Sequence, residues 1–221
     1  MLLALGLIGS LALTAVIVVR WMNRRIDWLG RIAPFPKISV GLSLALALCF
    51  GIPLAVEAWV EHQLEGAASH IAGGPVQVSC QSLGQAFVDL GPELGYVAWG
   101  PDGVPERSTL IKFRPCGNLR AWLGSTKVNP SLDQVIAVHV VTHETMHMVG
   151  LTNEAHAECA AVQRDAAMAE ALGASPAEAR DLALRYWTEV YPRMPDEYVG
   201  GCGAGGTYDE QLPDAPWTPA G

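Results

Sequence analysis

The sequence predicts an α+β protein: an N-terminal transmembrane helical hairpin, followed by a small, mainly helical domain with a short β-hairpin. Three observations support this prediction. Two long apolar runs occupy the first sixty residues, and three capped helical patterns follow residue 130. Between these two regions, two strand patterns flank a Gly-Pro-Asp-Gly turn. We expect residues 1–60 to hold two transmembrane helices, residues 61–75 to be a linker, and residues 76–221 to form the folded domain.

The two apolar runs, residues 2–19 and 38–56, contain no charged side chain. Each is close to the ~20 residues that cross about 30 Å of hydrocarbon as a helix. The loop between them, residues 20–37, carries five basic residues and one acid, and basic loops stay in the cytoplasm. We therefore expect a multi-pass protein of the cell membrane whose C-terminal domain is extracytoplasmic. Three tryptophans fall where indole rings favour the membrane interface: Trp21, Trp28 and Trp59.

These runs have two other interpretations. A secretory signal peptide fits residues 1–20 poorly, because no positive charge precedes the apolar run. Buried core helices of a soluble protein are also possible, but the length of the runs and their lack of charge favour membrane spans. The lipid bilayer is therefore an expected partner.

The charge of the chain is unevenly distributed. Residues 61–221 carry nine of the 14 basic residues and 20 of the 22 acidic ones, and the whole chain has a net charge of −8. An acidic domain of this kind is not expected to bind nucleic acid. The sequence does not indicate an oligomeric state.

Four of the five cysteines lie in the part expected outside the membrane, where the environment is oxidising. Two disulfides are therefore expected, and three pairings are possible. The order of the chain favours Cys80–Cys116 and Cys159–Cys202. A four-thiolate zinc site is disfavoured because no C-x-x-C pair is present. Cys49, inside the second apolar run, is expected to act as a small hydrophobic residue.

Strand patterns are found at residues 76–80, 95–100 and 108–113. The last two flank the turn and predict a hairpin. Three helices are then expected, over residues 131–149, 153–172 and 175–191. Ser131 and Asn153 are N-cap signals for the first two helices, and Gly150 and Gly173 are their stop signals. The third helix starts with the capping box Ser175-Pro176-Ala177-Glu178. The Gly- and Pro-rich segment 194–221 is expected to have little regular structure.

The first of these helices carries His143-Glu144-Thr145-Met146-His147, which matches H-E-x-x-H. Residues at i and i+4 share a helix face, so both imidazoles can reach one metal ion. Glu144 is the expected general base, which takes a proton from a metal-bound water as it attacks a carbonyl. His139, one turn earlier, is expected to support the site rather than bind the metal.

The third metal ligand is expected on the next helix, because only three residues join the two helices. Glu158 lies about one turn into that helix, level with His147 across the turn. Glu158 is therefore the predicted third ligand beside His143 and His147. Glu154 is the alternative, although it also suits the helix N-terminus, and His156 is the weakest candidate. Two histidines, a carboxylate and water form an accepted catalytic Zn²⁺ set.

The motif resembles that of the zincin metallopeptidases. Gly150 extends the likeness toward the metzincins, but their third ligand would fall on Asn153, so a gluzincin-like arrangement fits better. Residues 143–163 also resemble small bacterial membrane-anchored proteins with the same motif, in which the pattern around Tyr198, Cys202, Gly205-Gly206 and Asp209 recurs. This likeness covers residues 76–217 and implies no particular substrate.

The function predicted from these features is a membrane-anchored zinc metallopeptidase that acts on a peptide or protein substrate. Zincins commonly hold substrate beside an edge strand, which the hairpin 95–113 could supply. An oxyanion donor is also expected, and Tyr186, Tyr191 and Tyr198 are candidates. The alternative is a catalytically inactive, zinc-stabilised extracytoplasmic binding domain. A structural protein with an accidental motif and an intramembrane protease fit less well, since the motif is far from both apolar runs.

Overall fold

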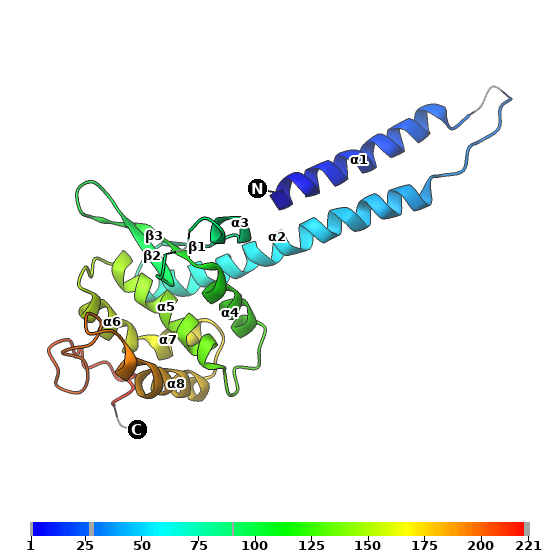
Figure 1. The fold of residues 1–221 in the computed structure, drawn as a ribbon. Coiled ribbons are helices and arrows are strands. Elements are labelled where there is room, and N and C mark those ends of the chain that lie inside the picture. Colours follow the sequence, from blue (N-terminus) through cyan, green and yellow to red (C-terminus); the bar gives the residue numbers. More distant parts are fainter. Residues whose placement is uncertain (1, 27–28, 90, 219–221) are drawn as a thin grey trace. The chain divides into compact units, whose positions relative to one another are not determined.

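The computed structural model describes residues 2–26, 29–89 and 91–218 (Figure 1). The chain is a mixed α+β protein, mostly helical, with a small three-stranded sheet and two long apolar N-terminal helices. It divides into two compact units, Met1–Trp59 and Val60–Gly221. Trp28, expected at the membrane interface, lies outside the described residues.

Unit 1 contains α1 (Leu2–Arg24) and most of α2 (Lys37–Ile71), and both helices are long and apolar enough to cross a membrane. The two helices pack through small residues. The Thr14 hydroxyl donates to Ser43 Oγ at 2.8 Å, and the ring of Phe50 lies 2.9 Å from where a Cβ on Gly6 would stand. Small side chains and interhelical hydrogen bonds of this kind bring apolar helices together in lipid, where the hydrophobic effect does not.

The expected linker 61–75 is mostly helical, because α2 continues to Ile71. The last turns of α2 belong to unit 2, where Val60, Leu64 and Ala68 are buried. The side chain of Glu61 accepts from the Cys80 backbone N–H at 2.8 Å, so this helix also covers one edge of the sheet.

The sheet of unit 2 has the order β1-β3-β2, formed by β1 (Gln77–Cys80), β2 (Gly95–Trp99) and β3 (Pro105–Ile111). The strands β2 and β3 form the expected antiparallel hairpin, and β1 pairs with β3 in parallel. The short α3 (Leu83–Ala86) follows β1. The helix α4 (Phe113–Leu123) was not anticipated from the sequence, because Pro115 and Gly117 disfavour a helical pattern.

The helix α5 (Leu132–Met148) is the centre of unit 2, and 13 of its 17 residues are buried. It begins at the Ser131 capping box and ends before Gly150, whose φ of +105° suits glycine. The strands β2 and β3 pack on it, as do α4, α6 (Glu154–Val162), α7 (Asp165–Ala171) and α8 (Pro176–Arg185). Helix α8 continues as a widened turn, Tyr186–Val190, and a short 3₁₀ turn, Tyr191–Arg193.

The single helix expected over residues 153–172 is wrong, since the chain breaks at Gln163 between α6 and α7. The Gln163 side chain at this break binds a distant part of the chain. Gln163 Nε2 donates to the carbonyl of Tyr208, and its Oε1 accepts from the Glu210 N–H, so the C-terminal segment is attached at this point. The predicted disulfides, Cys80–Cys116 and Cys159–Cys202, are both present.

Candidate metal centre

The helix α5 presents His143 and His147 from successive turns on one face. Their Nε2 atoms lie 2.9 Å apart. The next helix begins with Glu154 after the Asn153 cap, and its Oε2 lies 3.2 Å from His143 Nε2 and 3.3 Å from His147 Nε2. These three atoms, here called the donor triad, form a group that could hold a metal ion.

The other nitrogen of each ring faces a hydrogen-bond acceptor. His143 Nδ1 lies 3.0 Å from Glu158 Oε2, and His147 Nδ1 lies 2.6 Å from the Leu151 carbonyl oxygen. Because a carboxylate and a carbonyl only accept, both Nδ1 atoms donate. In the neutral rings both Nε2 atoms then carry lone pairs, which face each other at 2.9 Å. Such an arrangement needs a proton or a cation between the rings.

The electrostatics of the donor triad favour positive charge. Burial by itself lowers the pKa of His143, but Glu154 and Glu158 raise it to about 9. Hydrogen bonds from His143 and His147 lower the pKa of Glu154 to about 2. Near neutral pH the carboxylate of Glu154 is therefore ionised and lies where it can share a cation with the two rings.

The spacing of the donor triad can be compared with that of a zinc site. Tetrahedral zinc with bonds of about 2.0–2.1 Å places neighbouring ligand atoms about 3.3 Å apart. The separations of 2.9, 3.2 and 3.3 Å approach this spacing. Two imidazoles and one carboxylate are also an accepted donor set for catalytic zinc. The residues of the triad therefore fit the ion.

Glu144, the predicted general base, lines the same cleft. Its carboxylate is almost completely buried, and its Oε2 has no hydrogen-bond partner among the described residues. Burial raises the pKa of Glu144, while His143 and His147 act in the opposite direction. A buried carboxylate without a partner is costly, so the position indicates a group that is completed by a ligand.

The strand β2 lies directly against Glu144. A Cβ on Gly95 would stand 3.0 Å from Glu144 Cγ and Oε1. The backbone of Gly95 is not in the left-handed region, so conformational freedom does not require glycine here. Glycine is required at position 95 because the Glu144 side chain occupies the space beside it.

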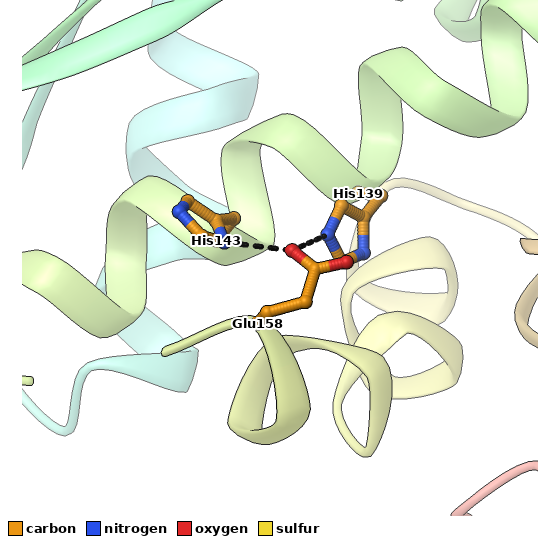
Figure 2. Close-up of side chains that lie close together, drawn as sticks. All are labelled: His139, His143 and Glu158. Carbon is orange, nitrogen blue, oxygen red and sulfur yellow. Dashed lines mark hydrogen bonds and ion pairs between the residues drawn. The ribbon is translucent and has the colours of Figure 1, made fainter. Parts of the chain in front are cut away.

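Behind His143 lies a set of buried polar side chains, here called the buried network: His139, Glu158, Asp165 and Tyr186. Figure 2 shows Glu158 pointing from its helix between His139 and His143 of α5. His139 Nδ1 lies 2.8 Å from Asp165 Oδ2, and His139 Nε2 lies 3.0 Å from Glu158 Oε2. The Tyr186 hydroxyl donates to Glu158 Oε1 at 2.6 Å, and its ring stacks on His139.

His139 therefore lies between two carboxylates. Burial alone lowers its pKa, but Asp165 and Glu158 raise it to about 10, so both ring nitrogens donate at neutral pH. Burial raises the pKa of Glu158, but His139 and His143 hold it well below its ordinary range. Glu158 is thus an ionised carboxylate that accepts three hydrogen bonds, from His139, His143 and Tyr186.

His139, His143 and Glu158 form a second group whose atoms are close enough to hold a metal ion. Hydrogen bonds alone also account for this group, because His139 Nε2 and His143 Nδ1 can each donate to Glu158 Oε2. The predicted ligand Glu158 therefore faces Nδ1 of His143, whereas Glu154 faces Nε2 of both rings. His156, the weakest candidate, stacks instead on Tyr208.

The site opens into a cleft of about 670 Å³ between β2, α5 and the segment that follows α8. The three candidate tyrosines have different environments. The Tyr186 hydroxyl is bonded to Glu158, and the Tyr191 hydroxyl accepts from the Gly200 N–H at 3.3 Å. Tyr198 lines the cleft with its ring centroid 5.8 Å from that of His143.

The C-terminal segment is held on α6, the helix that carries both glutamates. The Cys159–Cys202 disulfide joins the segment to the residue after Glu158. Arg164 makes two hydrogen bonds of 2.6 Å to the Glu210 carboxylate. These attachments place one wall of the cleft, including Tyr198, beside the donor triad.

Asp165 was not identified from the sequence. It lies seven residues after Glu158, two helical turns along the expected helix, and Ala161 and Val162 lie between them on the same face. Another acid on this largely apolar face is the signal that could have revealed it.

Comparisons of the chain with protein-family models, with curated proteins and with solved structures find no match. The function of the site is therefore inferred from its own geometry and chemistry.

Proposed function

We propose that the chain is a membrane-anchored zinc peptidase of the zincin type, which hydrolyses peptide bonds on the extracytoplasmic side. One observation carries the proposal: the donor triad converges at 2.9–3.3 Å beside the unpartnered, buried carboxylate of Glu144, within an open cleft. Two apolar helices long enough to cross a membrane, together with two disulfides, support the location.

The proposed ligands are His143, His147 and Glu154. The contacts of Glu158 favour a different role, since its oxygens already accept three hydrogen bonds. A carboxylate that binds the far nitrogen of a metal-binding histidine fixes the orientation of the ring and directs its lone pair at the ion. Glu158 is therefore assigned as a positioning residue behind His143.

Zinc, when bound, supplies a Lewis acid that polarises a carbonyl and lowers the pKa of a water molecule to about 7. With the ion bound, Glu144 would accept a proton from the attacking water and would then pass it to the departing amine. The raised pKa of Glu144 suits both steps, because the group must be ionised first and protonated next.

The peptide is proposed to bind along the free edge of β2. The Leu94 carbonyl accepts from the Lys112 N–H. The backbone N–H and C=O groups of Leu94 and Tyr96 therefore face β3. In an antiparallel pair the alternate residues, Gly95 and Val97, then direct their N–H and C=O groups to the opposite edge. An extended substrate can pair with that edge. Tyr198 is the proposed oxyanion donor, since the other two tyrosines are engaged elsewhere.

The experiment that tests this proposal compares Glu144→Gln with the native chain, both purified full length in lipid nanodiscs. Zinc content is measured by mass spectrometry, and hydrolysis is measured on a mixture of unstructured peptides. We expect the variant to keep its zinc and to lose about 10²–10⁴-fold in kcat, the usual contribution of a general base.

Two outcomes would change the conclusion. Zinc in the native chain without any hydrolysis would favour the alternative, a zinc-stabilised binding domain. A native chain that takes up no zinc after metal exchange would exclude both functions, since each needs the donor triad to hold the ion.

A further inference from the structure

Three large apolar side chains that are close in sequence stand out from the surface of unit 2. Leu83, Phe87 and Val88 are 57%, 75% and 83% exposed. They belong to residues 82–88, Ser-Leu-Gly-Gln-Ala-Phe-Val, which include α3 and no charged side chain. A concentration of exposed apolar groups on an ordered surface marks a contact with another molecule or with a membrane.

The segment is held in this outward arrangement by polar contacts at its base. Gln81 Nε2 donates to Asp89 Oδ2 at 2.8 Å, and Gln81 Oε1 accepts from the Phe113 N–H at 3.1 Å. Lys112 forms an ion pair with the same Asp89. Within the loop, Ser82 and Gln85 cap α3 reciprocally. The apolar side chains therefore cannot turn inward unless the base opens.

The base of the loop lies beside the part of α2 that enters unit 2. The Cys80 N–H donates to Glu61 Oε1 at 2.8 Å, and Gln81 is the next residue of the chain. Glu61 follows the apolar run 38–56 by five residues, so the chain can separate it from the end of that run by at most about 17 Å. If the run spans a membrane, the base of the loop is therefore tethered close to the lipid headgroups.

We propose that residues 82–88 form a membrane-docking loop, which inserts Leu83, Phe87 and Val88 into the headgroup–acyl boundary of the bilayer that α2 spans. The lipid is favoured over a protein partner because only five residues of chain join the end of the span to Glu61, which binds the base of the loop. Because the segment has no charged side chain, insertion depends on apolar contact and does not require anionic lipid. The inference rests on α2 as a span and not on hydrolysis.

The test uses nitroxide labels on the full chain in phosphatidylcholine nanodiscs, with both disulfides kept oxidised. Paramagnetic resonance measures how far oxygen, which enters lipid, and a polar nickel complex, which stays in water, reach each label. Cys49, the free cysteine within α2, is labelled in the native chain and calibrates the span. Val88→Cys and Phe87→Cys are each labelled in a Cys49→Ala background. Leu184→Cys, at another exposed apolar position on α8, is the matched control.

We expect the ratio of oxygen to nickel accessibility at positions 87 and 88 to be several-fold higher than at position 184 and to approach that at position 49. Replacing a third of the lipid with phosphatidylglycerol should not raise the ratio, since the domain that carries the loop is acidic. Water-like values at 87 and 88 beside a lipid-like value at 49 would overturn the docking loop. So would labels shielded from both reagents, which indicate a protein contact. A water-like value at 49 would overturn the span, and the loop with it.

Discussion

Glu154 and Glu158 are the same residue type, one turn apart on one helix, yet they contact opposite sides of His143. Glu154 is partly exposed at the cleft and faces the Nε2 atoms of two rings. Glu158 is buried, faces Nδ1 of His143, and accepts two further hydrogen bonds from His139 and Tyr186. Helix periodicity makes both carboxylates candidates, and the proposed division into a metal ligand and a positioning residue rests on their different partners.

The largest effect is expected from Glu154→Gln, which replaces the only carboxylate of the donor triad with a neutral amide. Zinc affinity should fall by more than the ~100-fold that outer-shell changes produce. Competition with a chromogenic chelator measures it. Glu170→Gln, an exposed acid on α7, is the control and should bind zinc as the native chain does.

Glu158→Gln should have a smaller effect, a loss of about 10–100-fold in zinc affinity, because His143 keeps its Nε2 but loses the acceptor that orients it. The same chelator assay gives the comparison directly. If this variant lost zinc completely while Glu154→Gln retained it, the ligand would be Glu158, as the sequence predicts, and the two roles would be exchanged.

The buried network predicts a pH dependence of stability in the metal-free protein. The pKa of His139 is raised from 6.5 to about 10, so its stabilising contribution is complete below pH 6.5 and is lost as the pH rises through about 10. The urea midpoint of the native chain should therefore fall over this interval. The fall should be shallower in His139→Gln, and equal slopes in the two proteins would contradict a charged His139.

The smallest effect is expected from Gly95→Ala, which tests how the general base is placed. The added methyl would stand 3.0 Å from Glu144, so the carboxylate must shift by a few tenths of an ångström. We expect kcat to fall about tenfold, less than the ~100-fold that a 1 Å displacement can cause. Zinc content should be unchanged.

Gly117→Ala on α4 is the matched control, since no atom lies within 4 Å of its added methyl. In a Glu144→Gln background, Gly95→Ala should have no further effect on kcat. A further loss in that background would show that Gly95 acts on something other than Glu144.

The features of the fold that depend on local signals in the sequence were predicted correctly. The caps at Ser131 and Ser175, the hairpin at residues 95–113 and both disulfides follow from residue type, spacing and redox chemistry, and the structure confirms them. The pairing of β1 with β3 in parallel depends on contacts distant in sequence, which local patterns do not encode.

The site was predicted less completely, for the same reason. The spacing of His143 and His147 fixes one helix face, but the choice between two glutamates depends on how α6 rolls against α5. Asp165 binds His139 and Tyr186 binds Glu158 from other elements, and these contacts are not visible in the local pattern. At the break, Gln163 binds the backbone of Tyr208 and Glu210, which lie far along the chain.

The disulfide between Cys159 and Cys202 joins residues 43 apart, and this separation has a consequence for biosynthesis. The ribosome makes the helix that bears Glu154 and Glu158 well before it makes the segment that bears Tyr198. A nascent chain that stops between them has the two imidazoles but lacks the wall that covers them. If the proposed hydrolysis is correct, activity would then arise only after the whole segment has been made and an oxidant has joined the two thiols.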